Sequence, residues 1–102
     1  NSITVATLSL EVENIIGNSL QRSINGTYPA IDPDTTNKIF SSIQNTVESI
    51  HFNNNRTILL VSPKIRAPFR KLVDMVFPNI TVLSLNEIPS DVQIKAQGIV
   101  NI

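Results

Sequence analysis

The spacing of apolar residues predicts strands near both ends of the chain. Residues Ile3–Leu10 are rich in β-branched and apolar side chains and contain neither Gly nor Pro, which favours a strand. From Val92 onward, apolar residues and Gly98 occupy the even positions, whereas the odd positions begin with Gln, Lys and Gln. This period of two predicts a strand with one face in water, at or near the edge of a sheet.

Between these strands, the first half of the chain carries the spacing of two amphipathic helices. In Glu11–Arg22 the apolar residues fall at i, i+3, i+4 and i+8, and two acidic residues stand in the first turn, where the helix dipole favours them. A loop is expected over Ser23–Asp32. Asp32 followed by Pro33 then has the form of an N-cap and a first-turn proline, so a second helix is expected to run from there to the Asn-rich turn at His51–Asn55.

The second half predicts a strand, a helix and another strand. Thr57–Val61 carries aliphatic side chains on both faces of the expected strand, as in a strand covered by helices on both sides. The next strand is expected at Ile80–Leu85. The helix between them is expected to begin near Ala67, after a short turn over Ser62–Arg66, because Pro68 would clash with a carbonyl one turn back if the helix were already running.

Together these elements predict an α/β fold with a small sheet of about four strands. Strand-helix-strand units form the parallel core of this sheet, a C-terminal strand forms an edge, and three helices pack on it. With 102 residues, one hydrophobic core is expected. Because the chain opens on Asn1 rather than Met and stops within an alternating run, we expect residues 1–102 to be a single subdomain cut from a longer protein.

Composition narrows the classes of function. The 8 basic and 8 acidic residues give a formal net charge of zero, and aromatic residues make up 5% of the chain. The chain therefore has neither a long-range field nor many stacking rings to attract nucleic acid. The absence of cysteine excludes disulfides, thiolate nucleophiles and zinc-thiolate sites. The longest aliphatic run, Ile58–Val61, is far shorter than the ~20 residues of a membrane span.

No catalytic, cofactor-binding or metal-binding set can be assembled from the sequence. His51 is the one histidine and has no acidic partner at an orienting spacing, which favours an exposed loop residue. Ser62 lacks the flanking glycines of a nucleophile elbow, which favours a turn residue. There is no Gly-rich loop to cradle phosphates. We therefore expect no enzyme, and one alternative remains: a stand-alone module that binds a small anion at the helix start after Ser62.

Two groups of charged residues are candidates for contacts. Lys64, Arg66, Arg70 and Lys71 place half of the basic residues within eight positions. They could form a docking patch for an acidic partner, or a solvated outer face whose aliphatic stems cover apolar neighbours. Glu87 follows the strand after this helix, and we expect it to form a structural ion pair with Arg66 or Arg70. The candidate residues for protein interaction or a structural ion pair are thus Arg66, Arg70, Lys71 and Glu87.

The second half of the chain contains Ser62-Pro63, Ile65-Arg66, Phe77-Pro78, Val82-Leu83-Ser84 and Asn86-Glu87-Ile88 in this order. With these motifs, residues 56–98 resemble the C-terminal end of the large export-gate protein of flagellar and virulence-associated type III secretion systems, the FlhA/InvA family. Thr7-Leu8-Ser9-Leu10-Glu11 also resembles the strand-to-helix entry of that family, without the proline often found there. The matching positions in the second half are Ser62, Pro63, Ile65, Arg66, Arg70, Phe77, Pro78, Val82, Leu83, Ser84, Asn86, Glu87, Ile88, Val92, Ile94 and Gly98.

This resemblance implies the last of four subdomains in the cytoplasmic portion of a bacterial inner-membrane protein. It implies a non-enzymatic protein without cofactors, whose cytoplasmic portions form a nonameric ring that receives secretion substrates and their chaperones. The implied partners are the other subdomains of the parent protein, further copies in the ring, substrates and chaperones, but neither nucleic acid nor, for this segment itself, the membrane. In this family the chaperone-binding cleft is formed mainly by earlier subdomains, so the resemblance implies no chaperone-binding residue in this chain.

Overall fold

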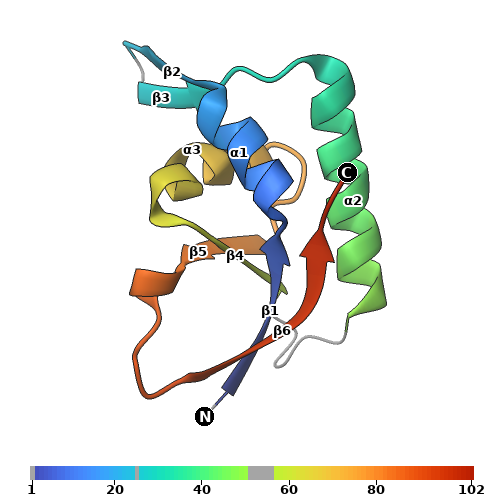
Figure 1. The fold of residues 1–102 in the computed structure, drawn as a ribbon, viewed down its shortest axis with the longest axis vertical. Helices are drawn as coiled ribbons and strands as arrows, with labels where there is room; N and C mark the ends of the chain where they lie inside the picture. Colours follow the sequence, from blue (N-terminus) through green and yellow to red (C-terminus); the bar gives the residue numbers. More distant parts are fainter. Residues whose placement is uncertain (1, 25, 51–56) are drawn as a thin grey trace.

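The computed structural model describes residues 2–24, 26–50 and 57–102, and its main sheet has four parallel strands in the order β5-β4-β1-β6 (Figure 1). The strands are Ser2–Leu8 (β1), Thr57–Val61 (β4), Ile80–Ser84 (β5) and Gln93–Val100 (β6). The helices are Leu10–Asn18 (α1), Pro33–Ser49 (α2) and Pro63–Asp74 (α3), and a short 3-10 helix, η2, spans Leu85–Glu87. The predicted α/β class is confirmed, with β6 at an edge. The predicted turn at His51–Asn55 lies outside the described residues.

The first helix is shorter than predicted, and a β-hairpin follows it. Helix α1 begins one residue after Ser9, whose side-chain oxygen accepts a hydrogen bond from the Val12 N–H, and ends at Asn18. Residues Leu20–Ser23 (β2) then pair antiparallel with Gly26–Pro29 (β3). The prediction of a helix to Arg22 and a loop to Asp32 is therefore wrong. Leu20 continued the helical spacing by chance, and the hairpin turn is permitted by Gly26, whose φ is +112°.

The prediction that α3 starts near Ala67 is also wrong. The helix begins at Pro63, so Pro68 lies inside it and leaves the Lys64 carbonyl without the usual N–H donor. Ile65 shows why the additional turn forms. It is buried in the same core as Phe69 and Val73, at i, i+4 and i+8, so an early start buries one more large side chain. Burial of a residue of this size is worth about 1.5–3 kcal/mol, which offsets much of the cost of an internal proline, about 3 kcal/mol.

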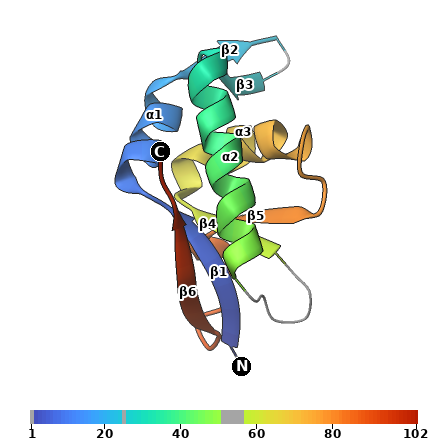
Figure 2. The same cartoon turned by 90° about the vertical axis from the view of Figure 1, so that its right-hand side faces the viewer.

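All three helices pack against the same face of the sheet, here called the helix face. One cluster of buried residues joins Val12 and Ile16 of α1, Ile39 and Ile43 of α2, and Ile65, Phe69 and Val73 of α3 with strand residues Ala6, Leu8, Leu59, Val61, Val82 and Val100. Figure 2 shows α2 on one side of β1 and β6. The expectation that helices cover β4 on both sides is wrong, because all three helices of the described residues pack on the helix face.

A bulge divides β6 between the two faces of the sheet. Val5 of β1 pairs with Ala96, but the next residue, Ala6, pairs with Gly98, so that Gln97 is an additional residue on the edge strand. An extra residue of this kind reverses the side-chain alternation. Ala96 therefore lies on the face opposite to Gly98, and the even positions of β6 do not form the single face that the sequence pattern predicted.

Candidate functional site

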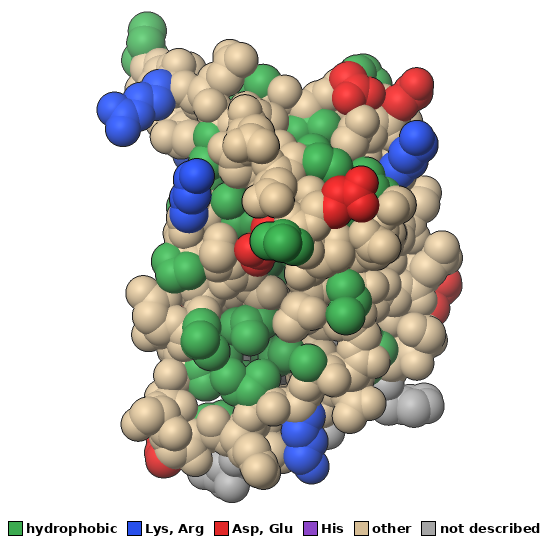
Figure 3. All heavy atoms as spheres, in the orientation of Figure 1, with side chains coloured by type: hydrophobic (Ala, Val, Ile, Leu, Met, Phe, Trp, Pro, Cys, Tyr) green, Lys and Arg blue, Asp and Glu red, His purple; other side chains and the backbone are tan. Residues whose placement is uncertain are grey.

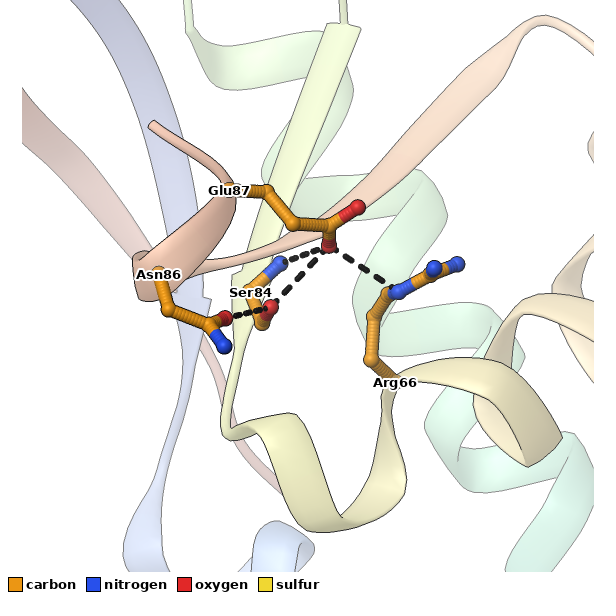
Figure 4. Close-up of polar contacts among 4 residues, drawn as sticks. All are labelled: Arg66, Ser84, Asn86 and Glu87. Atoms are coloured by element: carbon orange, nitrogen blue, oxygen red, sulfur yellow. Dashed lines mark hydrogen bonds and ion pairs between the residues drawn. The ribbon is translucent and has the colours of Figure 1, made fainter. Parts of the chain in front are cut away.

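The structure brings Glu87 together with Arg66 rather than Arg70. Arg66 projects from α3 and its Nε lies 2.9 Å from Oε1 of Glu87, which is the last residue of η2 (Figure 4). Both side chains remain about one-third exposed, at 30% and 35%. Arg70 instead faces Asp74, one turn along the same helix, with 3.7 Å between Nε and Oδ2. The two arginines of the candidate set thus have different surroundings.

Glu87 also caps the end of β5. Its Oε1 accepts a hydrogen bond from the Ser84 N–H at 2.9 Å and lies 3.0 Å from the Ser84 hydroxyl, which is also a donor to Oδ1 of Asn86. The hydrogen bond from the Ser84 N–H is the main reason that the pKa of Glu87 lies below its ordinary value, and Arg66 and Arg70 lower it further. One carboxylate thus joins α3, the end of β5 and the start of the connection to β6.

Arg70 and Lys71 are the candidate residues whose charged groups face outward. Among the described residues Lys71 forms no ion pair, and its Nζ lies beside the hairpin, 3.0 Å from the place that a Cβ on Gly26 would take. Arg70, Asp74 and Glu87 line a groove of about 400 Å³ along the edge strand β5. Asp74 did not enter the sequence-based set, although its i+4 spacing from Arg70 was a usable signal.

The helix start after Ser62, where the alternative hypothesis places a small anion, already faces a carboxylate. The Ser62 N–H donates a hydrogen bond to Oε2 of Glu13 on α1 at 3.0 Å. A second anion at this point would meet the negative charge of Glu13, so the geometry does not favour the alternative. The contact also ties α1 to the first turn of α3, a role for Glu13 that no local sequence pattern indicated.

The described residues contain neither a metal-binding cluster nor a membrane-spanning helix. Within 2–24, 26–50 and 57–102 no three His, Cys, Asp or Glu side chains are grouped so that they could hold a metal ion. None of the helices in these ranges combines the length and apolar character needed to cross a bilayer. His51 lies outside the described residues. The charged residues around α3 provide hydrogen-bonding groups and charges at the protein surface.

Comparison with known proteins decides the family. The sequence pattern of the FHIPEP family matches residues 1–93. This chain belongs to the FHIPEP family. The flagellar biosynthesis protein FlhA of Bacillus subtilis is 32% identical over 100 residues, which cover 98% of this chain and 15% of that protein. The chain thus spans less than one-sixth of the length of this FHIPEP relative, and the expected likeness to a C-terminal subdomain of the export-gate protein is confirmed.

Solved structures share the fold over almost the whole chain. The Chlamydia pneumoniae CdsV protein is 31% identical with a TM-score of 0.83, covering 99% of this chain and 29% of that one. In its complex with the CdsO protein, CdsV is 32% identical with a TM-score of 0.83, covering 98% and 29%. Nonameric EPEC SctV-C is 25% identical with a TM-score of 0.81, covering 98% and 29%. FlhA is by name a flagellar biosynthesis protein, and the nonameric EscV cytosolic domain of a type III secretion system is 26% identical with a TM-score of 0.70, covering 97% of this chain and 29% of that one.

Proposed function

We propose that this chain is a non-enzymatic protein-interaction subdomain of a type III secretion export gate. In this role it contributes to the cytoplasmic ring that receives substrates and chaperones for export. The observation that carries the proposal is the match of nearly the entire chain to one part of nonameric SctV-C. The CdsV–CdsO complex supports a role in binding a further secretion protein.

The same proposal places the chain within a larger protein. It is a single subdomain of an integral membrane protein, on the cytoplasmic side of the bacterial inner membrane. Its nearest partners are the other subdomains of that protein and neighbouring copies in the ring. The short share of its relatives that the chain spans, 15% of FlhA and 29% of CdsV, supports this placement.

The geometry around α3 suggests separate roles for the four candidate residues. Arg66 and Glu87 are engaged with each other and with Ser84, so we assign them to holding α3 against the β5–β6 connection. Arg70 is 59% exposed and only loosely paired with Asp74, and Nζ of the exposed Lys71 lies beside the hairpin. We assign Arg70 and Lys71 to contacts with an acidic surface of a partner protein.

The test is a secretion assay with the longer protein in its own bacterium. Deletion of this subdomain should abolish export of at least one class of substrate, and the double substitution Arg70→Glu/Lys71→Glu should reduce export while the protein accumulates normally. Lys38→Glu on α2 and Lys95→Glu on β6 are matched charge reversals elsewhere on the surface and should leave export unchanged. Normal export of every substrate class by the deletion variant would refute the proposed function.

A further inference from the structure

The face of the sheet opposite the helices is apolar and uncharged, and is here called the open face. The pairing of the strands assigns its members, because paired residues of neighbouring parallel strands point to the same side of the sheet. Ile3 pairs with Ile94, and Leu60 pairs with Leu83. The open face comprises Ile3, Val5, Thr7, Ile58, Leu60, Thr81, Leu83, Ile94, Ala96 and Ile99.

No helix among the described residues covers this face, since α1, α2 and α3 all contribute to the core on the helix face. Figure 3 shows hydrophobic side chains gathered in the area that Figure 1 shows enclosed by β5, β1 and the connection to β6. Val5 and Ile58 are nevertheless buried within the subdomain, whereas Thr81 and Ala96 are exposed and Ile99 is 62% exposed. All-parallel sheets in folded proteins are almost always covered on both faces. The open face therefore lacks the second layer that such a sheet normally has.

The bulge in β6 enlarges the open face. Without the additional residue Gln97, the edge strand would keep one alternation, and Ile94 would point to the same side as Gly98 and Val100. With it, Ile94 and Ala96 join Ile3 and Val5 on the open face, while Val100 stays in the core. Strand β6 thus supplies apolar side chains to both faces of the sheet. A strand whose outer face met only water would not need apolar side chains on that face.

We propose that the open face docks against the part of the same polypeptide that precedes this subdomain. The chain is a C-terminal subdomain that spans 29% of solved relatives such as CdsV, so most of the related chain comes before it. That part joins the subdomain at β1, where Ile3 already lies on the open face. A covalently joined partner has a high effective concentration. Because the open face carries no charge, its occupant is an apolar surface.

The proposal is tested by thiol labelling in the longer protein. This chain contains no cysteine, so single cysteines can be placed by Thr81→Cys, Ala96→Cys and Ile99→Cys on the open face. Ser41→Cys and Glu48→Cys, at exposed positions on α2, are the matched controls. The labelled peptide is identified by mass spectrometry, which separates the introduced thiol from any other. If the face is covered, its cysteines should react about tenfold more slowly than the controls, because labelling then requires the contact to open.

Two results would overturn the proposal. Equal labelling rates on the open face and on α2 would mean that the face is free in the longer protein. Protection that disappears when the protein is diluted would assign the cover to another copy rather than to the same polypeptide. Protection that is independent of concentration, and that is lost together with the contact in low urea before the subdomain itself unfolds, is the expected result.

Discussion

Gly98 is the position at which the structure predicts the sign of a stability change most sharply. A Cβ at Gly98 would lie 2.5 Å from Cδ1 of Ile50, the residue that follows α2, and 3.0 Å from Cγ2 of Thr46 in the last turn of α2. Carbon atoms pack best at about 3.5–4.0 Å. In open space, Gly→Ala within a strand would stabilise by roughly 0.5–1 kcal/mol. Here overpacking costs about 1–3 kcal/mol, so Gly98→Ala should destabilise the chain by about 1–2 kcal/mol.

The neighbour that creates the clash provides the control. Ile50→Val removes Cδ1, the atom at 2.5 Å, and should itself cost about 0.5–1.5 kcal/mol. In that background Gly98→Ala should cost less, although Cγ2 of Thr46 at 3.0 Å remains, which gives a coupling energy of up to about 1 kcal/mol in a double-mutant cycle. Gly17→Ala is a second control, because a Cβ at Gly17 would meet only atoms at 3.8 and 3.9 Å. That substitution should stabilise α1 by up to about 1 kcal/mol.

Urea unfolding of the four variants of the cycle, followed by circular dichroism, measures these differences if the slope of the transition stays constant. The reasoning fails if Gly98→Ala stabilises the chain. It also fails if Gly98→Ala costs the same with Ile or Val at position 50, because the approach of α2 to β6 would then not be the cause.

Three further predictions concern the core and the two carboxylates with lowered pKa values. Phe69→Ala should destabilise the chain by about 3–5 kcal/mol in urea unfolding, because Phe69 is fully buried; Phe69→Leu should cost much less. Glu87→Gln and Arg66→Ala should each lower the urea midpoint, and the double variant should lower it by less than their sum; additive effects would show that the contact at 2.9 Å contributes nothing. The pKa values of Asp32, which caps α2 through Thr35, and of Glu87 both lie below their ordinary values. The stability that these two carboxylates contribute is therefore present above their pKa in the unfolded chain and is lost as the pH falls through their pKa in the folded chain. Asp32→Asn combined with Glu87→Gln should therefore reduce the loss of stability below about pH 4.5. If the free energy of unfolding falls with pH in the double variant as it does in the parent chain, this prediction is wrong.

The order of strands and helices could be predicted because each main element carries its own period. The hairpin at Leu20–Pro29 could not, since Leu20 happens to continue the spacing of α1 and a four-residue strand has too few residues to display its own period. The start of α3 was missed because the local rule against an internal proline was outweighed by burial of Ile65, which depends on the tertiary structure.

The candidate site divides in the same way. The pairing of a carboxylate after β5 with a base on α3 followed from topology, because strand-helix-strand units bring the end of one strand beside the next helix. The choice of Arg66 over Arg70 depended on where α3 begins, and the contact of Glu13 with Ser62 joins residues that are 49 positions apart. Interactions of this range leave no periodic trace in the sequence.

The bulge at Gln97 also bears on how copies of this subdomain behave when they are crowded together. β6 is an edge strand, and a regular edge offers a continuous row of backbone groups on which a foreign strand can grow. The additional residue interrupts that row midway, and Lys95 places a charge beside the interruption. An incoming strand could pair with only a few residues on either side of it. Many copies held side by side could thus stay in solution without joining their sheets edge to edge.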